Sequence, residues 1–202
     1  HYQAGPAGEP EAIGGFNTLK MVYDYSPIPK ELDSADAKYV LGAQANVWTE
    51  YIPTVSQLEY MVLPRMLALS EVLWTPKENR NYVDFYNRLQ NQFRVFGENG
   101  FNYCPGNFTV TIKPTAQDGK LLVTLSSEIP RSSIYYTIDS SDPDAGSDEY
   151  KSPIQIDSSV TLKAVIVVEG KVMGLKPAEQ KFVMHKAIGK NLTYTYPVSK
   201  YY

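Results

Sequence analysis

An indole and a carboxylate two residues apart, Trp48 and Glu50, are the first side chains of this 202-residue chain to suggest chemistry. An indole can stack on the apolar face of a pyranose ring, and a carboxylate can accept hydrogen bonds from its hydroxyls. Considered alone, Trp48 more often packs in a core, and Glu50 more often forms an ordinary ion pair. The spacing therefore raises a sugar-binding site as a hypothesis beside these two structural alternatives.

The segment that must position these side chains is residues 39–52. Its first half is short and apolar. The segment is preceded by an acidic stretch that ends before Lys38, and it is followed by Pro53. This pattern favours a strand buried on both faces over a helix. Side chains alternate along a strand, so Asn46, Trp48 and Glu50 are expected to point to one side. The predicted strand therefore brings all three to a single site.

Helical spacing predicts three helices around this strand. Leu19, Val22 and Tyr23 predict a short helix within residues 18–25. After Pro53 the apolar residues again recur at helical spacing, and Pro64 is expected to kink this helix; they are Leu58, Val62, Met66, Leu69 and Leu73. The third helix carries one apolar face, made by Tyr82, Phe85, Leu89, Phe93 and Phe96.

The helix ends carry their own signals. Thr54 with Gln57, or equally Ser56 with Glu59, has the spacing of a capping box at the start of the second helix. Gly97 or Gly100 can end the third helix. Arg65 and Glu71, on the second helix, are interpreted as structural, through an ion pair or a helix-terminus contact.

From Asn107 onward the apolar period changes from helical to alternating. Alternation predicts strands around Val110 to Ile112, 121–125, 134–138 and 160–166, and the pairs at 118–119 and 169–170 predict tight turns. Several short strands with turns between them predict a small antiparallel sandwich close in size to an immunoglobulin-like domain.

A resemblance to a known family covers both halves. Residues 58–74, directly after 48–52, resemble the last strand and helix of the catalytic barrel of family-twenty glycoside hydrolases, the β-N-acetylhexosaminidases. Residues 134–143 and 150–154 resemble the C-terminal domain of chitobiases and hexosaminidases. The resemblance implies an α+β chain: a helical remnant of a (β/α)8 barrel, then an antiparallel immunoglobulin-like β-sandwich. The expected domains are 1–106, the C-terminal part of a TIM-barrel catalytic domain, 107–186, the β-sandwich, and 187–202, a tail or linker.

The resemblance also implies roles for the opening pair. Trp48 would line the floor of the pocket for a terminal N-acetyl sugar, and Glu50 would accept hydrogen bonds from its hydroxyls. In this family the substrate's own 2-acetamido oxygen attacks the anomeric carbon, while an Asp-Glu pair on an earlier strand orients the acetamide and protonates the leaving oxygen. The pair Asp148-Glu149 lies in the sandwich and cannot serve, so no catalytic residue is expected in this chain.

The implied function is therefore that of part of a glycosidase. The parent would remove terminal non-reducing N-acetylglucosamine or N-acetylgalactosamine residues from glycans, and this fragment would be inactive. The alternative is a non-catalytic carbohydrate-binding or structural β-sandwich module whose helical half supports it. The chain opens without methionine, which suggests a piece of a longer precursor, and the family implies a periplasmic or extracellular location. The exposed barrel remnant is expected to drive homo-oligomerisation.

Other partners and cofactors are not expected. A net charge of −3 gives no footprint for nucleic acid, and no apolar run is long enough to span a membrane. Asp142, Asp144, Gly146 and Asp148 are spaced like part of a calcium loop but lack its distal Glu, so a solvated turn is favoured. His1 and His185 have no Cys or His partner at ligand spacing, so neither a metal site nor a cofactor is predicted.

Overall fold

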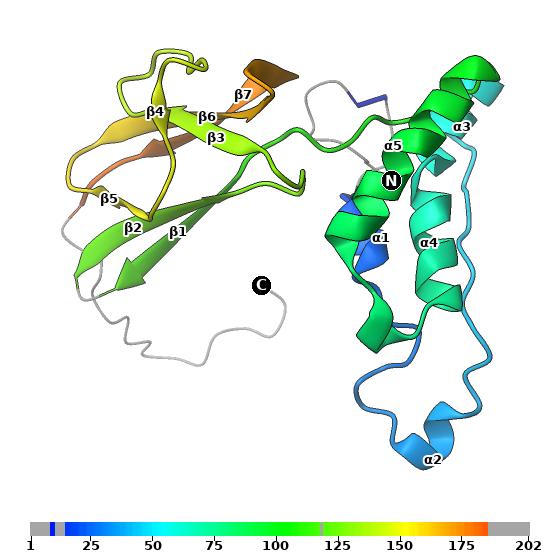
Figure 1. Cartoon of the computed structure of the whole chain (residues 1–202). Coiled ribbons are helices and arrows are strands. Elements are labelled where there is room, and N and C mark those ends of the chain that lie inside the picture. The colour runs from blue at the N-terminus through cyan, green and yellow to red at the C-terminus, as the bar shows by residue number, and fades with distance from the viewer. Residues whose placement is uncertain (1–8, 11–14, 118, 186–202) are drawn as a thin grey trace. The chain divides into compact units, whose positions relative to one another are not determined.

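The computed structural model describes residues 9–10, 15–117 and 119–185, which fall into two compact units (Figure 1). The first unit comprises the residues up to 109 together with 128–131, and the second comprises 110–127 and the residues from 132 onward. The described elements of the first unit are helices, and those of the second are antiparallel strands. The chain is therefore a mixed helical and antiparallel-sheet structure, in agreement with the predicted α+β class.

The first unit is built around a small apolar core. Its helices are α1 (Leu19–Tyr23), α2 (Ser34–Ala37), α3 (Val55–Val62), α4 (Arg65–Trp74) and α5 (Tyr82–Glu98), with a 3-10 turn at Lys77–Asn79. One buried cluster joins α1, α4 and α5, and it consists of Leu19, Tyr23, Ala68, Phe85 and Leu89. The apolar faces predicted for the first and third helices are thus the faces that these helices bury.

The second predicted helix is two helices. Thr54 begins α3, because its hydroxyl accepts a hydrogen bond from the Gln57 amide at 3.2 Å, so the first of the two capping alternatives is the one used. Leu63 has an extended backbone, with φ −94° and ψ 130°, and α4 starts after Pro64. The prediction of one kinked helix was wrong because a residue before proline is pushed out of the helical region.

The end of α5 is closed by a glycine in the left-handed region. Gly100 has φ +73°, and its N–H donates to the Gly97 carbonyl at 3.2 Å. The Phe101 N–H donates to the Phe96 carbonyl at 2.9 Å, and the two rings meet edge to face. This pair of hydrogen bonds and its apolar contact form a Schellman motif, so Gly100 rather than Gly97 ends the helix.

The strand predicted at residues 39–52 does not form. Residues 40–49 are neither strand nor helix, and Leu41 is 97% exposed. A parallel strand needs neighbours to pair its backbone N–H and C=O groups. The described part of the first unit contains no such neighbour, so a strand at these residues has nothing to pair with there.

The second unit holds two antiparallel sheets. One has the order β1 (Thr111–Gln117), β2 (Lys120–Ser126), β5 (Ile154–Ile156), and the other β4 (Asp148–Glu149), β3 (Ser133–Thr137), β6 (Val160–Val168), β7 (Lys171–Phe182). On β2 the buried residues alternate, namely Val123 and Leu125, which confirms the predicted alternation there. On β6 the prediction was wrong, because β6 buries Leu162 and then the four consecutive residues 164–167, so both of its faces are covered.

The turn between β6 and β7 is also confirmed. Glu169 and Gly170 both have positive φ, +49° and +77°, as a two-residue type I′ turn requires. In the predicted β1–β2 turn, Gly119 has φ +74°, whereas Asp118 lies outside the described residues. The predicted tail, 187–202, also lies outside them.

Candidate functional site

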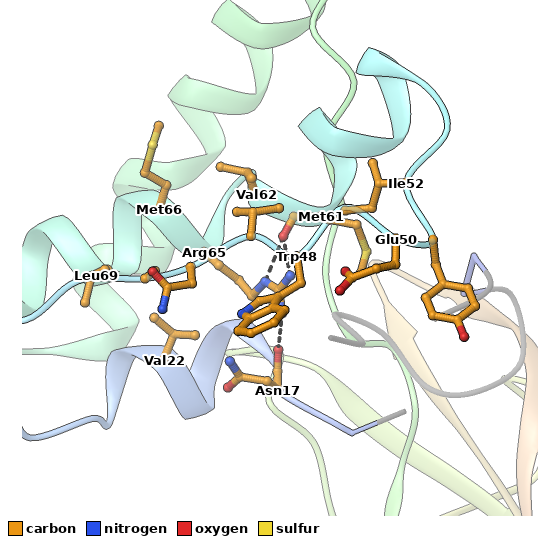
Figure 2. A pocket seen from close by; sticks show the side chains of 14 residues that line it. Asn17, Val22, Trp48, Glu50, Ile52, Met61, Val62, Arg65, Met66 and Leu69 are labelled. Carbon is orange, nitrogen blue, oxygen red and sulfur yellow. Dashed lines mark hydrogen bonds between the residues drawn. The ribbon is translucent and has the colours of Figure 1, made fainter. Parts of the chain in front are cut away.

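A cavity of about 370 Å³ in the first unit brings the opening residues together (Figure 2). Asn46, Trp48 and Glu50 all line it, as the sequence predicted, although the segment that carries them is not a strand. Val47 and Tyr51 line it too, which strict alternation would not allow. The site residues therefore meet because the irregular segment runs along α3 and α4, not because of strand geometry.

Neither opening side chain is used as a core or ion-pair residue. Trp48 is 65% exposed, so its ring does not pack in a closed core in this structure. Glu50 is exposed, and it forms no ion pair with any of the residues that the structure describes. An open aromatic ring with an accessible carboxylate nearby suits a polar ligand with an apolar face.

Arg65 closes one wall of the cavity. Its Nε donates to the Met61 carbonyl at 3.0 Å and its Nη1 to the Asn17 carbonyl at 3.0 Å, and Figure 2 shows both bonds. Burial lowers the pKa of the Arg65 guanidinium, while nearby acidic groups oppose the shift. Arg65 thus satisfies a carbonyl at the end of α3, which confirms the predicted helix-terminus contact.

Glu9, Tyr60 and Cys104 form a hydrogen-bonded group near Arg65. The Tyr60 hydroxyl donates to Glu9 Oε1 at 2.9 Å, and the Cys104 thiol is hydrogen bonded to Tyr60 and to the Gly106 carbonyl. Burial raises the pKa of Tyr60 and that of Cys104, so both stay protonated near neutral pH. Sequence reasoning missed this group because its members are far apart in the chain and match no local motif.

The other predicted residues have structural contacts. Glu71 on α4 accepts a hydrogen bond from Arg88 on α5 at 2.7 Å, which is the predicted ion pair. Asp142 is paired with Lys163 at 2.7 Å, and Asp144 accepts the Gly146 N–H at 2.8 Å within a turn. Asp148 lies on β4.

Two kinds of feature are absent from the part of the chain that the structure describes. Among these residues, no three or more His, Cys, Asp or Glu side chains lie close enough together to hold a metal ion. His1, one of the two histidines that were not expected to bind a metal, lies outside the described residues. None of the helices described is long and apolar enough to cross a bilayer.

Two family models match the chain, one in each half. Residues 1–77 match the glycosyl hydrolase family 20 catalytic domain, and residues 114–176 match the chitobiase/beta-hexosaminidase C-terminal domain. The first match contains the cavity residues Asn46, Trp48, Glu50 and Arg65. The second contains β2 to β6.

Three beta-hexosaminidases are similar to parts of this chain. A beta-hexosaminidase of Porphyromonas gingivalis is 37% identical over 179 residues, which is 86% of this chain and 22% of that protein. A beta-N-acetylhexosaminidase of Cellulomonas fimi is 32% identical over 89 residues, 44% of this chain and 18% of that protein. A beta-hexosaminidase of Vibrio vulnificus is 37% identical over 75 residues, 29% of this chain and 9% of that protein. The chain thus spans less than a quarter of each of these relatives, and it resembles in order the glycosyl hydrolase family 20 catalytic domain and the chitobiase/beta-hexosaminidase C-terminal domain.

Proposed function

We propose that this chain is the C-terminal part of a β-N-acetylhexosaminidase that removes terminal non-reducing N-acetyl-hexosamine residues from glycans. Residues 1–106 would be the C-terminal part of its TIM barrel, 107–186 an immunoglobulin-like β-sandwich, and 187–202 a tail or linker. The observation that carries the proposal is the cavity lined by Asn46, Trp48 and Glu50 inside the match to the catalytic domain.

The roles proposed for this chain are in binding. Trp48 would stack against the N-acetyl sugar at the floor of its pocket, and Glu50 would accept hydrogen bonds from the sugar hydroxyls. Arg65, hydrogen bonded to two backbone carbonyls of the wall, would keep that wall in place. Glycans ending in N-acetylglucosamine or N-acetylgalactosamine are the proposed substrates, in a periplasmic or extracellular setting.

The chemical step needs groups that this chain does not supply. In substrate-assisted hydrolysis the 2-acetamido oxygen attacks the anomeric carbon, and a carboxylic acid protonates the leaving oxygen. Asp148 and Glu149 form a short strand, β4, and Glu149 is engaged by Ser133 at 2.9 Å and Lys151 at 2.6 Å. These carboxylates are held in a sheet of the second unit, so the chain alone should be inactive.

A chimera tests the proposal. This chain would replace the matching part of the Porphyromonas gingivalis beta-hexosaminidase, and an aryl N-acetyl-β-glucosaminide would be the substrate, with the unaltered relative as the positive control. The chimera is expected to turn over and the isolated 202-residue chain to show only the buffer rate. Turnover by the isolated chain would reveal a catalytic acid within these residues. A chimera with the circular dichroism of the relative but no turnover would contradict the proposed function.

A further inference from the structure

A half-buried carboxylate outside the cavity is held by three donors. Glu128 follows β2, yet the short segment 128–131 groups with the first unit. The Thr18 hydroxyl donates to Glu128 Oε1 at 2.5 Å, and the Asn107 side chain and the Lys20 backbone N–H are also hydrogen bonded to this carboxylate. Thr18 is 0% and Asn107 4% exposed, so two of the most deeply buried polar side chains of the described residues serve one acidic group.

The segment carrying Glu128 is packed in place. Ile129 is 6% exposed, and a Cβ built on Gly106 would lie 3.1 Å from its Cδ1 atom. Gly106 has φ +141°, a conformation that side chains rarely adopt. Ile129 therefore packs closely on the backbone of Gly106, and this apolar contact holds the segment in place together with the hydrogen bonds of Glu128.

The carboxylate caps the helix that leads into the cavity wall. Thr18 is the N-cap of α1, and the Lys20 N–H is one of the donors that the start of a helix leaves without an intrahelical partner. Asn17, directly before the cap, and Val22, within α1, both line the cavity. The Asn17 carbonyl also accepts the hydrogen bond from Arg65, which lines the same cavity (Figure 2).

We propose that Glu128 is a positioning residue of the candidate sugar site: by capping α1 it fixes Asn17, and through Asn17 it fixes Arg65 in the wall of the cavity that Trp48 lines. The consequence for sugar turnover rests on the proposed function, whereas the link from Glu128 to Trp48 does not. Residues 128–131, which lie between β2 and β3 in the sequence but belong to the first unit, would thus shape the site of that unit.

The link can be measured in the 202-residue chain by nuclear magnetic resonance. A Trp74→Phe background removes the other tryptophan, which is 88% exposed, and leaves Trp48 as the only indole signal. Glu128→Ala is compared with Glu128→Gln, which keeps one acceptor oxygen. Glu98→Ala is the matched control, because Glu98 is exposed and pairs with Arg94 within α5.

The expected result has two parts. Glu128→Ala should speed amide exchange in α1 about fivefold, the effect of losing a typical cap, and should shift the Trp48 indole signal. Glu128→Gln should show smaller changes of both kinds, and Glu98→Ala should show neither.

Two results would overturn the proposal. Faster exchange in α1 with an unmoved Trp48 signal would reduce Glu128 to an ordinary helix cap. Unchanged exchange and an unmoved signal would remove the contact itself. Where Glu128→Ala does not fold, Glu128→Gln decides in the same way, because it must still move the indole signal.

Turnover separates this proposal from the proposed function. In an active chimera, Glu128→Ala should lower kcat about tenfold with a smaller change in KM, because a displaced wall misplaces the bound sugar. An inactive chimera with a shifted Trp48 signal would refute the function and leave the positioning role standing. An active chimera in which Glu128→Ala changes neither kcat nor the Trp48 indole signal would support the proposed function and refute the positioning role.

Discussion

Trp48 and Glu50 reach the same cavity from an irregular segment, so their placement depends on the helices beneath them. Met61, Val62 and Arg65 line the cavity from α3 and the start of α4. The exposure of Trp48 leaves its ring available to a ligand, at the expense of the apolar contacts that a buried indole would make. The two side chains proposed to bind the sugar therefore do little for the stability of the first unit.

Substitution of these two residues in the chimera should separate stacking from hydrogen bonding. Trp48→Ala should lower kcat/KM by about a hundredfold, because the sugar loses the surface that aligns it. Glu50→Gln should cost on the order of 1.5 to 3 kcal/mol of transition-state binding, the value of a hydrogen bond to a charged group. Steady-state kinetics on the aryl glycoside are the measurement, and Asp142→Asn, a change in an exposed ion pair, is the control. Unchanged rates in both site variants would remove them from the sugar site.

Glu128 should make stability depend on pH. Burial raises the pKa of its carboxyl, against the opposing effect of the donors from Thr18, Asn107 and Lys20. A raised pKa in the folded state means that stability from this group is complete below the unfolded pKa and is lost as the pH rises through the folded pKa. The free energy of unfolding, relative to that of Glu128→Gln, should therefore fall between about pH 4.5 and about pH 7. Urea titrations at both values test this, and a difference that rises with pH would show that the donors outweigh burial.

At the scale of elements, the sequence predicted features that depend on neighbouring residues better than features that depend on residues far apart in the chain. The caps at Thr54 and Gly100 and the turn at Glu169 depend on residues within one turn of chain, so the sequence predicted the turn and offered each cap as one of two alternatives. The strand predicted at 39–52 needs neighbouring strands for its hydrogen bonds, and the described part of the first unit contains none. The contact between Thr18 and Glu128 joins residues 110 positions apart and has no local pattern. The cavity residues were predicted by type and family resemblance, whereas the wall that positions them was not.

The two glycines near the end of α5 should respond oppositely to one substitution. Gly100→Ala should destabilise the chain by about 1 kcal/mol, since alanine is strained at φ +73°. Gly97→Ala should stabilise it by up to about 1 kcal/mol, because Gly97 is helical and an added Cβ there meets nothing within 4 Å. Urea denaturation followed by far-ultraviolet circular dichroism compares them. Equal effects of the two changes would argue against the Schellman ending.

For the whole molecule, the first unit exposes much apolar surface. Leu41 is 97%, Trp74 88%, Tyr39 72% and Trp48 65% exposed. Surfaces of this kind on soluble proteins mark places where other chains bind. The matched relatives are longer than this chain, which spans less than a quarter of each. We therefore expect the isolated chain to associate with itself through this unit.

Sedimentation velocity should show that association and its origin. The average mass of the chain should rise with concentration, and Leu41→Lys should lower it by placing a charge on the apolar surface. Leu175→Lys on β7 is the matched control, because Leu175 is also exposed, at 78%, but lies in the second unit. A monomeric wild-type chain, or an equal effect of the two lysines, would contradict association through the first unit.

The burial of Cys104 also makes the chain suitable for site-specific labelling at introduced cysteines. It is the chain's one cysteine, it is 1% exposed, and burial raises the pKa of its thiol. Because thiolates rather than thiols attack maleimides and iodoacetamides, the folded chain should resist both reagents. A cysteine introduced at any exposed position would then take a fluorophore or spin label selectively, with no native thiol to remove. The slow reaction of Cys104 itself would time the opening of the first unit, since its backbone N–H is bonded to the Leu63 carbonyl at the junction of α3 and α4.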